Sequence, residues 1–375
     1  MPDLNFFVEL ALRFGLIAAG LFIVVGTVLS AIRTFVLPRS ANTWLTRQVF
    51  GAFSQVFLLR AKKKASYAER DQIMAMFAPT ALLALPVVWM ICIDVGYTLL
   101  YRAAVDDWWE AFRLSGSSLM TLGVAAPPTP LTYMLSYSEA ALGLIMVALL
   151  IGYLPTMYAT FSRRELAVNL LEVRAGSPPS AVEMLVRVHR IHGIDKLHEL
   201  WTEWEIWFAE LEETHTSLAA LVFFRSPTPE HSWVTAAGAV LDAAALMTST
   251  LDVPRDAQRE LCIRAGYLAL RKIADFFRIT YNHDPKPTDA ISITRDEFEG
   301  AYDELRAAGL ALKPDRDQCW RDFAGWRVNY DRVLLAIALL TLAPYAPWSS
   351  DRGLPDLRPG GVAVRGKTKT EKAAS

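Results

Sequence analysis

The sequence predicts an all-α membrane protein that carries a second, helical domain in the cytoplasm. Three stretches within the first 160 positions are apolar over about twenty residues, the length that crosses the hydrocarbon core of a bilayer. After position 163 apolar residues recur with helical spacing instead, and no useful length alternates as a strand would. At 375 residues the chain is long enough for both parts.

The three apolar stretches define the expected transmembrane helices. The first covers 6–36, with an uncharged run at 14–32, and we assign 1–37 to an N-terminal transmembrane helix. The second and third helices are expected at 73–101 and 131–161. Each of the three is long enough to span a bilayer with some tilt.

Charge in the connecting segments predicts the orientation. The loop 38–72 is basic, which places it in the cytoplasm by the positive-inside rule, and its cations are Arg47, Arg60, Lys62, Lys63, Lys64 and Arg70. The third stretch ends in Arg163 and Arg164, whereas the segment between the second and third stretches is acidic. We therefore expect a multi-pass protein of the plasma membrane (the inner membrane in a bacterium), with its N-terminus outside and its C-terminal domain cytoplasmic.

The segment 105–130, between the second and third stretches, is unusually apolar for an exposed loop. Asp106 or Asp107 can cap a short amphipathic helix that runs into Thr121-Leu122-Gly123. Non-helical backbone at membrane depth is tolerated only when it is buried in protein or lines a water-filled cavity. We therefore predict a re-entrant pore helix and filter at 106–127, with an ordinary extracellular loop as the alternative.

The order of these elements over about 75–166 resembles the pore unit of the potassium-channel (pore-loop cation channel) superfamily. Its signature reads Thr-x-Thr-Thr-Val-Gly-Tyr-Gly-Asp. Thr121 and Gly123 match its last Thr and first Gly, whereas Val124, Ala125 and Ala126 replace its Tyr, second Gly and Asp. The end of the pore helix then falls on the signature's first three positions, Ser118, Leu119 and Met120. The resemblance implies a homotetramer in which backbone carbonyls of Thr121–Ala125 replace the water around an ion.

The replaced residues predict weak selectivity. Filter carbonyls that all point inward need residues that tolerate left-handed backbone angles, which Gly123 supplies. Ala125 stands where the second glycine is expected, and a left-handed alanine costs about 1–2 kcal/mol. We expect the inner carbonyl sites, near Thr121, Leu122 and Gly123, to survive and the outer ones to be lost.

Two carboxylates lie within the expected membrane helices, Asp94 and Glu139. Charges at that depth are expensive and are usually paired or functional. We expect Arg113 of the pore helix to be the counter-ion and the ion pair to brace that helix against its neighbours. A cation-attracting or proton-sensing carboxylate is the functional alternative.

The third transmembrane helix carries residues that favour bending. Gly143 and Gly152 loosen a helix, and Pro155 removes a backbone donor near the cytoplasmic end. In the resembled family a bend in this helix separates the open from the closed state. These three positions are therefore a candidate gate, and ordinary membrane-helix packing is the alternative.

The cytoplasmic part, 163–348, is expected to be all-helical. Breaks fall at 176–179, 225–229 and 282–287, and helices are expected at 164–175, 180–192, 194–224, 232–249, 255–277, 294–308 and 315–342. The apolar run 334–347, which overlaps the end of the last of these, is too short for an ordinary transmembrane span and predicts a buried helix. The tail, 349–375, is basic and is expected to be disordered.

These observations predict the pore-forming subunit of a homotetrameric, weakly selective or non-selective channel for monovalent cations. The expected partners are monovalent cations and the lipid bilayer. No nucleic-acid partner is expected from a net charge of −1. No cofactor motif, metal-ligand pattern or catalytic constellation is found, so an enzyme is not expected. The alternative is a non-conducting, channel-derived membrane anchor or sensor whose helical domain binds a partner.

Overall fold

The computed structural model describes residues 4–35, 43–64, 66–191 and 193–354, and these residues form helices connected by short loops. Within them no strand forms, and the one β-bridge joins Leu251 to Leu312. The predicted all-helical fold is confirmed over this part of the chain. Two compact units are present: a membrane unit, Met1–Leu59 with Met76–Ala159, and a helical unit, Arg60–Ala75 with Thr160–Ser375.

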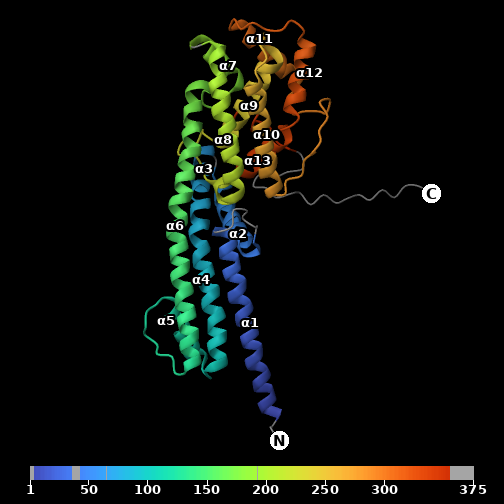
Figure 1. Cartoon of the computed structure of the whole chain (residues 1–375). Helices are drawn as coiled ribbons and strands as arrows, with labels where there is room; N and C mark the ends of the chain where they lie inside the picture. Colours follow the sequence, from blue (N-terminus) through green and yellow to red (C-terminus); the bar gives the residue numbers. More distant parts are fainter. Residues whose placement is uncertain (1–3, 36–42, 65, 192, 355–375) are drawn as a thin grey trace, which may run out of the picture. The chain divides into compact units, whose positions relative to one another are not determined.

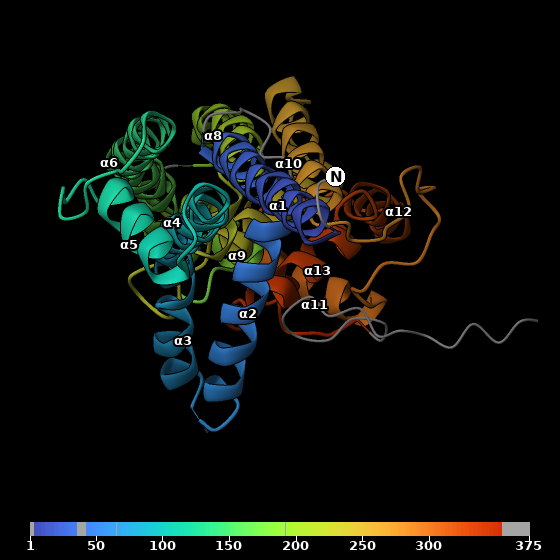
Figure 2. The same cartoon turned by 90° about the horizontal axis from the view of Figure 1, so that it is seen from below.

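The membrane unit is built on long helices that are labelled in Figure 1. They are α1 (Leu4–Phe35), most of α2 (Trp44–Ala61), α4 (Phe77–Ala104), the short α5 (Trp108–Leu119) and the first two thirds of α6 (Pro130–Ala175). Helix α4 packs against both α1 and α5, and Figure 2 shows α5 beside α4. The side chains that α4 and α5 bury completely include Leu85, Trp89, Ile93, Tyr101, Ala111 and Leu114.

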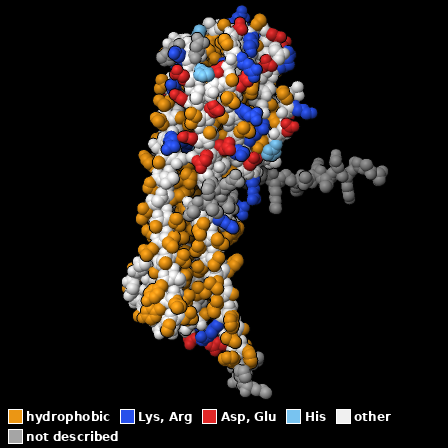
Figure 3. Space-filling view, viewed as in Figure 1, with side chains coloured by type: hydrophobic (Ala, Val, Ile, Leu, Met, Phe, Trp, Pro, Cys, Tyr) orange, Lys and Arg blue, Asp and Glu red, His pale blue; other side chains and the backbone are white. Residues whose placement is uncertain are grey.

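Three helical stretches are long and apolar enough to cross a membrane, as predicted: Phe6–Phe35, Tyr67–Ala104 and Pro130–Ala175. Their apolar side chains are largely exposed, and Figure 3 shows such side chains over the visible face of this unit. Because exposed apolar surface of this extent is stable in hydrocarbon rather than in water, the protein is membrane-embedded. The second stretch joins α4 to a separate short helix, α3 (Tyr67–Ala75), across Met76.

Helix α6 continues well past the predicted end at position 161. No proline or glycine occurs between Thr156 and Ala175, so nothing in that sequence terminates the helix. It ends where Gly176 takes a positive φ of 79°, a left-handed conformation that a glycine adopts at a helix terminus.

The helical unit is organised around one buried helix. Helix α9 (Trp233–Thr250) buries nearly every side chain and contacts α7, α10, α12 and α13. Its many alanines allow these neighbours to approach closely on all sides. The other helices of the unit are α3, α7 (Ala181–Ile191), α8 (Leu197–Ser217), α10 (Ala257–Phe276), α11 (Arg295–Ala307), α12 (Arg316–Arg327) and α13 (Asp331–Thr341), with 3₁₀ turns η1 (Ile194–Lys196) and η2 (Ala219–Phe223).

The stretch 315–342, predicted as one helix, forms two helices, α12 and α13, with a break at 328–330. The break brings Arg327 and Tyr330 to the same partner, because both donate hydrogen bonds to the buried carboxylate of Asp242 on α9. Arg327 also donates to Asp331 at 2.8 Å and to the carbonyl of Trp348 at 2.6 Å. Helix α13 is buried in the core of this unit, which agrees with the prediction for the apolar run there.

Removing the Asp242 carboxylate tests how much this buried cluster stabilises the helical unit. Asp242→Ala leaves the fully buried Arg327 without its main counter-ion, so we expect a loss of about 3–5 kcal/mol in the free energy of unfolding. The matched control is Asp303→Ala, which removes an exposed partner of Arg316 and is expected to cost less than about 1 kcal/mol. Denaturant unfolding in mild detergent measures both, and equal losses would contradict the assignment.

Candidate functional site

Helix α5 begins at a side-chain cap and ends beside the predicted filter. Asp107 is the N-cap, and its carboxylate accepts a hydrogen bond from the backbone N–H of Glu110 at 2.8 Å. The helix then buries a mixed apolar and hydroxyl face that consists of Ala111, Leu114, Ser115, Ser117, Ser118 and Leu119. The segment 120–129 follows α5 and leads the chain back to α6, which begins at Pro130.

The backbone after α5 alternates in sign at the predicted filter. Thr121 has a φ of 53° and Gly123 a φ of 67°, whereas Leu122 between them is not in the positive region. Left-handed geometry at Gly123 is as predicted, but at Thr121 it is unexpected, because an L-residue pays about 1–2 kcal/mol there. Ala125 does not adopt a positive φ, so the strain expected at that position does not arise.

Backbone carbonyls in the last turn of α5 accept hydrogen bonds from the first amides of this segment. The backbone N–H of Thr121 donates to the carbonyl of Ser118 at 3.0 Å, and that of Leu122 donates to the carbonyl of Ser117 at 2.8 Å. These bonds satisfy carbonyls that a helix end otherwise leaves without partners. They also hold the start of the segment against the helix.

The side chain of Ser117 holds the rest of the segment. Its buried hydroxyl accepts hydrogen bonds from the backbone N–H groups of Val124, at 3.0 Å, and Ala125, at 3.1 Å. Sequence reasoning missed Ser117, although a hydroxyl in the last turn of α5 could have pointed to it. Its role depends on the chain folding back seven and eight residues later, which local pattern does not specify.

These four amides fix the direction of the carbonyl groups. In a planar trans peptide the C=O of one residue points opposite to the N–H of the next. Because the N–H groups point towards α5, the preceding carbonyls point away from it, and they belong to Met120, Thr121, Gly123 and Val124. Carbonyl oxygens presented together can replace the water around a cation.

The side chains of the same segment are uncovered in the single chain. Leu122 is 63% exposed and Val124 is 71% exposed, and Met120 at the end of α5 is also exposed. Contiguous exposed apolar side chains of this kind are typical of surfaces that another molecule covers.

The end of α5 packs directly against Gly143 of α6, a contact that we call the Gly143 seat. A Cβ atom at this position would collide with the backbone carbonyl oxygen of Leu119, so only glycine permits the observed approach. At Gly152 the position of a Cβ atom is open, and α6 continues as one helix through Pro155. The observed role of Gly143 is thus close packing, and a gate at these three positions stays a prediction.

Hydroxyl groups, rather than ion pairs, join α5 to its neighbours. Ser118 Oγ lies 2.7 Å from Ser136 Oγ on α6 and 3.3 Å from the hydroxyl of Tyr101 on α4. Tyr97 on α4 reaches Ser138 on α6 at 2.9 Å in the same way. Hydrogen bonds of this kind hold membrane helices together without the cost of burying charge.

The prediction that Arg113 neutralises Asp94 or Glu139 is wrong. Arg113 lies on the exposed face of α5 and pairs with Glu110, one turn earlier, at 2.9 Å. Residues three apart lie on one face of a helix, so this partner is local. Glu139 instead accepts a 2.5 Å hydrogen bond from Ser115 on the buried face of α5.

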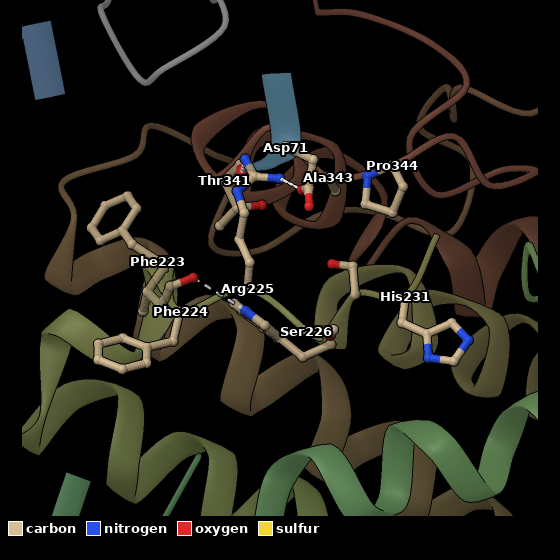
Figure 4. A pocket seen from close by; sticks show the side chains of 12 residues that line it. Asp71, Phe223, Phe224, Arg225, Ser226, His231, Thr341, Ala343 and Pro344 are labelled. Carbon is tan, nitrogen blue, oxygen red and sulfur yellow. Dashed lines mark hydrogen bonds and ion pairs between the residues drawn. The ribbon is translucent and has the colours of Figure 1, made fainter. Parts of the chain in front are cut away.

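A polar pocket of about 300 Å³, including its open mouth, lies in the helical unit (Figure 4). Arg225 lines this pocket, pairs with Asp71 of α3 and donates to the carbonyl of Thr341 at 2.7 Å. The pocket also includes Ser226, whose buried hydroxyl has no hydrogen-bond partner, and His231. Within the described residues no group of three or more His, Cys, Asp and Glu side chains is placed to hold a metal ion.

Comparison of this chain with protein-family models, with curated proteins and with solved structures gives no match. The assignment of function therefore depends on the geometry of the chain itself.

Two glycines of α6 provide a matched test of the seat. Gly143→Ala places a methyl group against the Leu119 carbonyl, a backbone atom that cannot turn aside, and we expect a loss of about 1–3 kcal/mol in stability. Gly152→Ala meets open space and replaces a poor helix former, so stability should stay the same or rise by up to about 1 kcal/mol. Thermal unfolding in detergent compares them, and equal effects would contradict the seat.

Ser117→Ala tests whether the Ser117 hydroxyl anchors the segment 121–125, whose outward-pointing carbonyls we call the carbonyl row. It leaves the amides of Val124 and Ala125 without their acceptor, and we expect a cost of about 1–3 kcal/mol. Ser136→Ala is the control, because it removes one contact between hydroxyls and deprives no backbone amide of a partner. Unfolding in detergent measures stability, and protection of the Val124 and Ala125 amides from hydrogen exchange reports the anchor directly. Unchanged protection in Ser117→Ala would disprove the anchor.

Proposed function

We propose that the protein is the pore-forming subunit of a homotetrameric, weakly selective or non-selective channel for monovalent cations. The observation that carries this proposal is the carbonyl row: four backbone amides between Thr121 and Ala125 point towards α5, so the preceding carbonyls point away from it. Oxygens in such a row can take the place of the hydration shell of a cation.

Weak selectivity is expected because the alternation of positive and negative φ along the filter stops before Ala125. Thr121 and Gly123 adopt positive φ and Ala125 does not. The alternation that aims carbonyls in one direction therefore extends as far as the Val124 carbonyl and does not continue through Ala125. A filter with fewer oxygen rings coordinates a dehydrated ion less completely, and discrimination between potassium and sodium should be small.

A ring of subunits is required because one chain supplies one row. The exposed Leu122 and Val124 are the surface that neighbouring copies would cover. Fourfold symmetry is the symmetry implied by the resemblance to the potassium-channel superfamily. Closed rotational symmetry would bring the four carbonyl rows around a common axis.

A second surface favours self-association. Beyond the apolar part of α6, Leu166, Leu170 and Val173 are each at least half exposed. They are spaced four and three residues apart, which is the heptad spacing of apolar residues in helices that pack against one another as a coiled coil. We propose that the four α6 helices contact one another there.

The orientation in the membrane is part of the same proposal. The basic segment 38–72 and Arg163-Arg164 place these regions in the cytoplasm, with the N-terminus outside. Segment 105–130 then re-enters a plasma membrane from the outside, and the helical unit is cytoplasmic. The rival function is a non-conducting membrane anchor or sensor whose helical unit binds a partner. The absence of a positive φ at Ala125 favours it, because the alternation that a full filter needs stops before that residue.

Flux and oligomeric state test the proposal together. Purified protein in liposomes should pass potassium and sodium at comparable rates and should be a tetramer by native mass spectrometry in mild detergent. A monomer or dimer, or no flux of either ion at any voltage or pH, would overturn the channel function.

Ala125→Gly tests the origin of the weak selectivity. A glycine can adopt the left-handed conformation that Ala125 avoids, so we expect the ratio of potassium to sodium flux to rise several-fold. Ala126→Gly is the control, one residue outside the filter, and should leave the ratio unchanged. Equal ratios in wild type and Ala125→Gly would place the cause of weak selectivity elsewhere.

A further inference from the structure

Ser115 of α5 contacts both residues of the membrane unit that carry a carboxyl group inside the expected transmembrane helices. Asp94 comes from α4, Glu139 from α6, and Ser115 from α5 between them. The Ser115 hydroxyl lies 2.5 Å from Glu139 Oε1 and 3.0 Å from the backbone carbonyl of Asp94. The Asp94 carboxyl faces α5 as well, because a methyl group at Gly116 would lie 3.8 Å from its Oδ1.

Each carboxyl group keeps one buried oxygen without a hydrogen-bond partner. Glu139 is 0% exposed, and its Oε2 has no donor; Oδ1 of Asp94 is buried and also has none. Tyr97 and Tyr101, the titratable neighbours on α4, direct their hydroxyls to Ser138 and Ser118 respectively.

Three basic side chains of the unit form ion pairs with other carboxylates. Arg13 of α1 pairs with Glu9 and Asp106, and Arg102 of α4 lies 4.0 Å from Asp106. Arg113 of α5 pairs with Glu110. Among the described residues of α1, α2, α4, α5 and α6, no ion pair reaches Asp94 or Glu139. The two carboxyl groups therefore face each other's field without a protein cation.

Two ionised carboxylates in this position would be strongly unfavourable. Burial in an apolar unit penalises each charge, and two like charges at one site penalise each other. A carboxyl group that keeps its proton removes a charge and gains an O–H donor for an oxygen that has none. A proton requires only two oxygens, whereas hard metal cations generally take six or more.

We propose that Asp94 and Glu139 form a proton-binding site that holds a proton at neutral pH and, with Ser115, joins α4, α5 and α6. The site does not depend on ion conduction, because it is defined by buried oxygens and not by the carbonyl row. The bound proton neutralises one of the two carboxyl groups, for which the described residues supply no cation.

Infrared spectroscopy of the full chain in detergent tests the site directly. At neutral pH the wild type should show the C=O stretch of a protonated carboxyl group, shifted in D₂O, although exposed carboxyl groups are ionised there. Glu139→Gln should abolish this band, because Glu139 is the fully buried carboxyl group, and Asp94→Asn should shift its frequency. Glu110→Gln, which changes a carboxylate already paired with Arg113, is the control and should leave it unchanged.

The wild-type spectrum alone can decide the outcome if a variant fails to fold. Absence of a protonated carboxyl band at neutral pH would overturn the proposal, as would a band that persists in Glu139→Gln or keeps its frequency in Asp94→Asn. The spectra are recorded in sodium, potassium and choline buffers. A band that is the same in all three supports a proton, whereas its loss in sodium or potassium alone would show a metal cation site and overturn the proton assignment.

Discussion

The predicted filter segment is held by one set of hydrogen bonds, those from the amides of Thr121, Leu122, Val124 and Ala125 to the last turn of α5. Ser117 contributes twice, through its backbone carbonyl and its hydroxyl. A backbone segment in an apolar environment has to satisfy its amides within the protein, since no water is available to do so. The helix end meets this requirement, and the orientation of the carbonyl row is its geometric consequence.

The anchor is useful only if α5 is itself held in place. The approach of the Leu119 carbonyl to Gly143 sets how closely the helix end can lie to α6. Hydroxyl contacts of Ser118 with Ser136 and Tyr101 then fix its orientation between α4 and α6. This arrangement uses close packing and neutral hydrogen bonds, which cost less at membrane depth than buried ion pairs do.

The sequence was sufficient for features that depend on local composition. The three apolar stretches, the cap of α5 and the left-handed Gly123 all follow from length, capping preference and the absence of a side chain. Features that depend on which helix face meets which neighbour were not predictable. The role of Ser117 needs the return of the chain, and Arg113 turned to Glu110 because α5 buries its opposite face. The break before α13 likewise depends on a distant carboxylate, Asp242.

The two halves of the candidate site are connected through a single turn of α5. Ser115 and Ser117 are two residues apart, and a helix rotates about 100° per residue, so their side chains project from opposite sides. The hydroxyl of Ser115 contacts the Glu139 carboxyl group and the backbone carbonyl of Asp94, whereas that of Ser117 accepts from the amides of Val124 and Ala125. If the proton on that pair were lost, the repulsion between two buried carboxylates would act on the helix that carries Ser117. Protonation in the interior and geometry of the carbonyl row would then be linked by a rigid element rather than by direct contact.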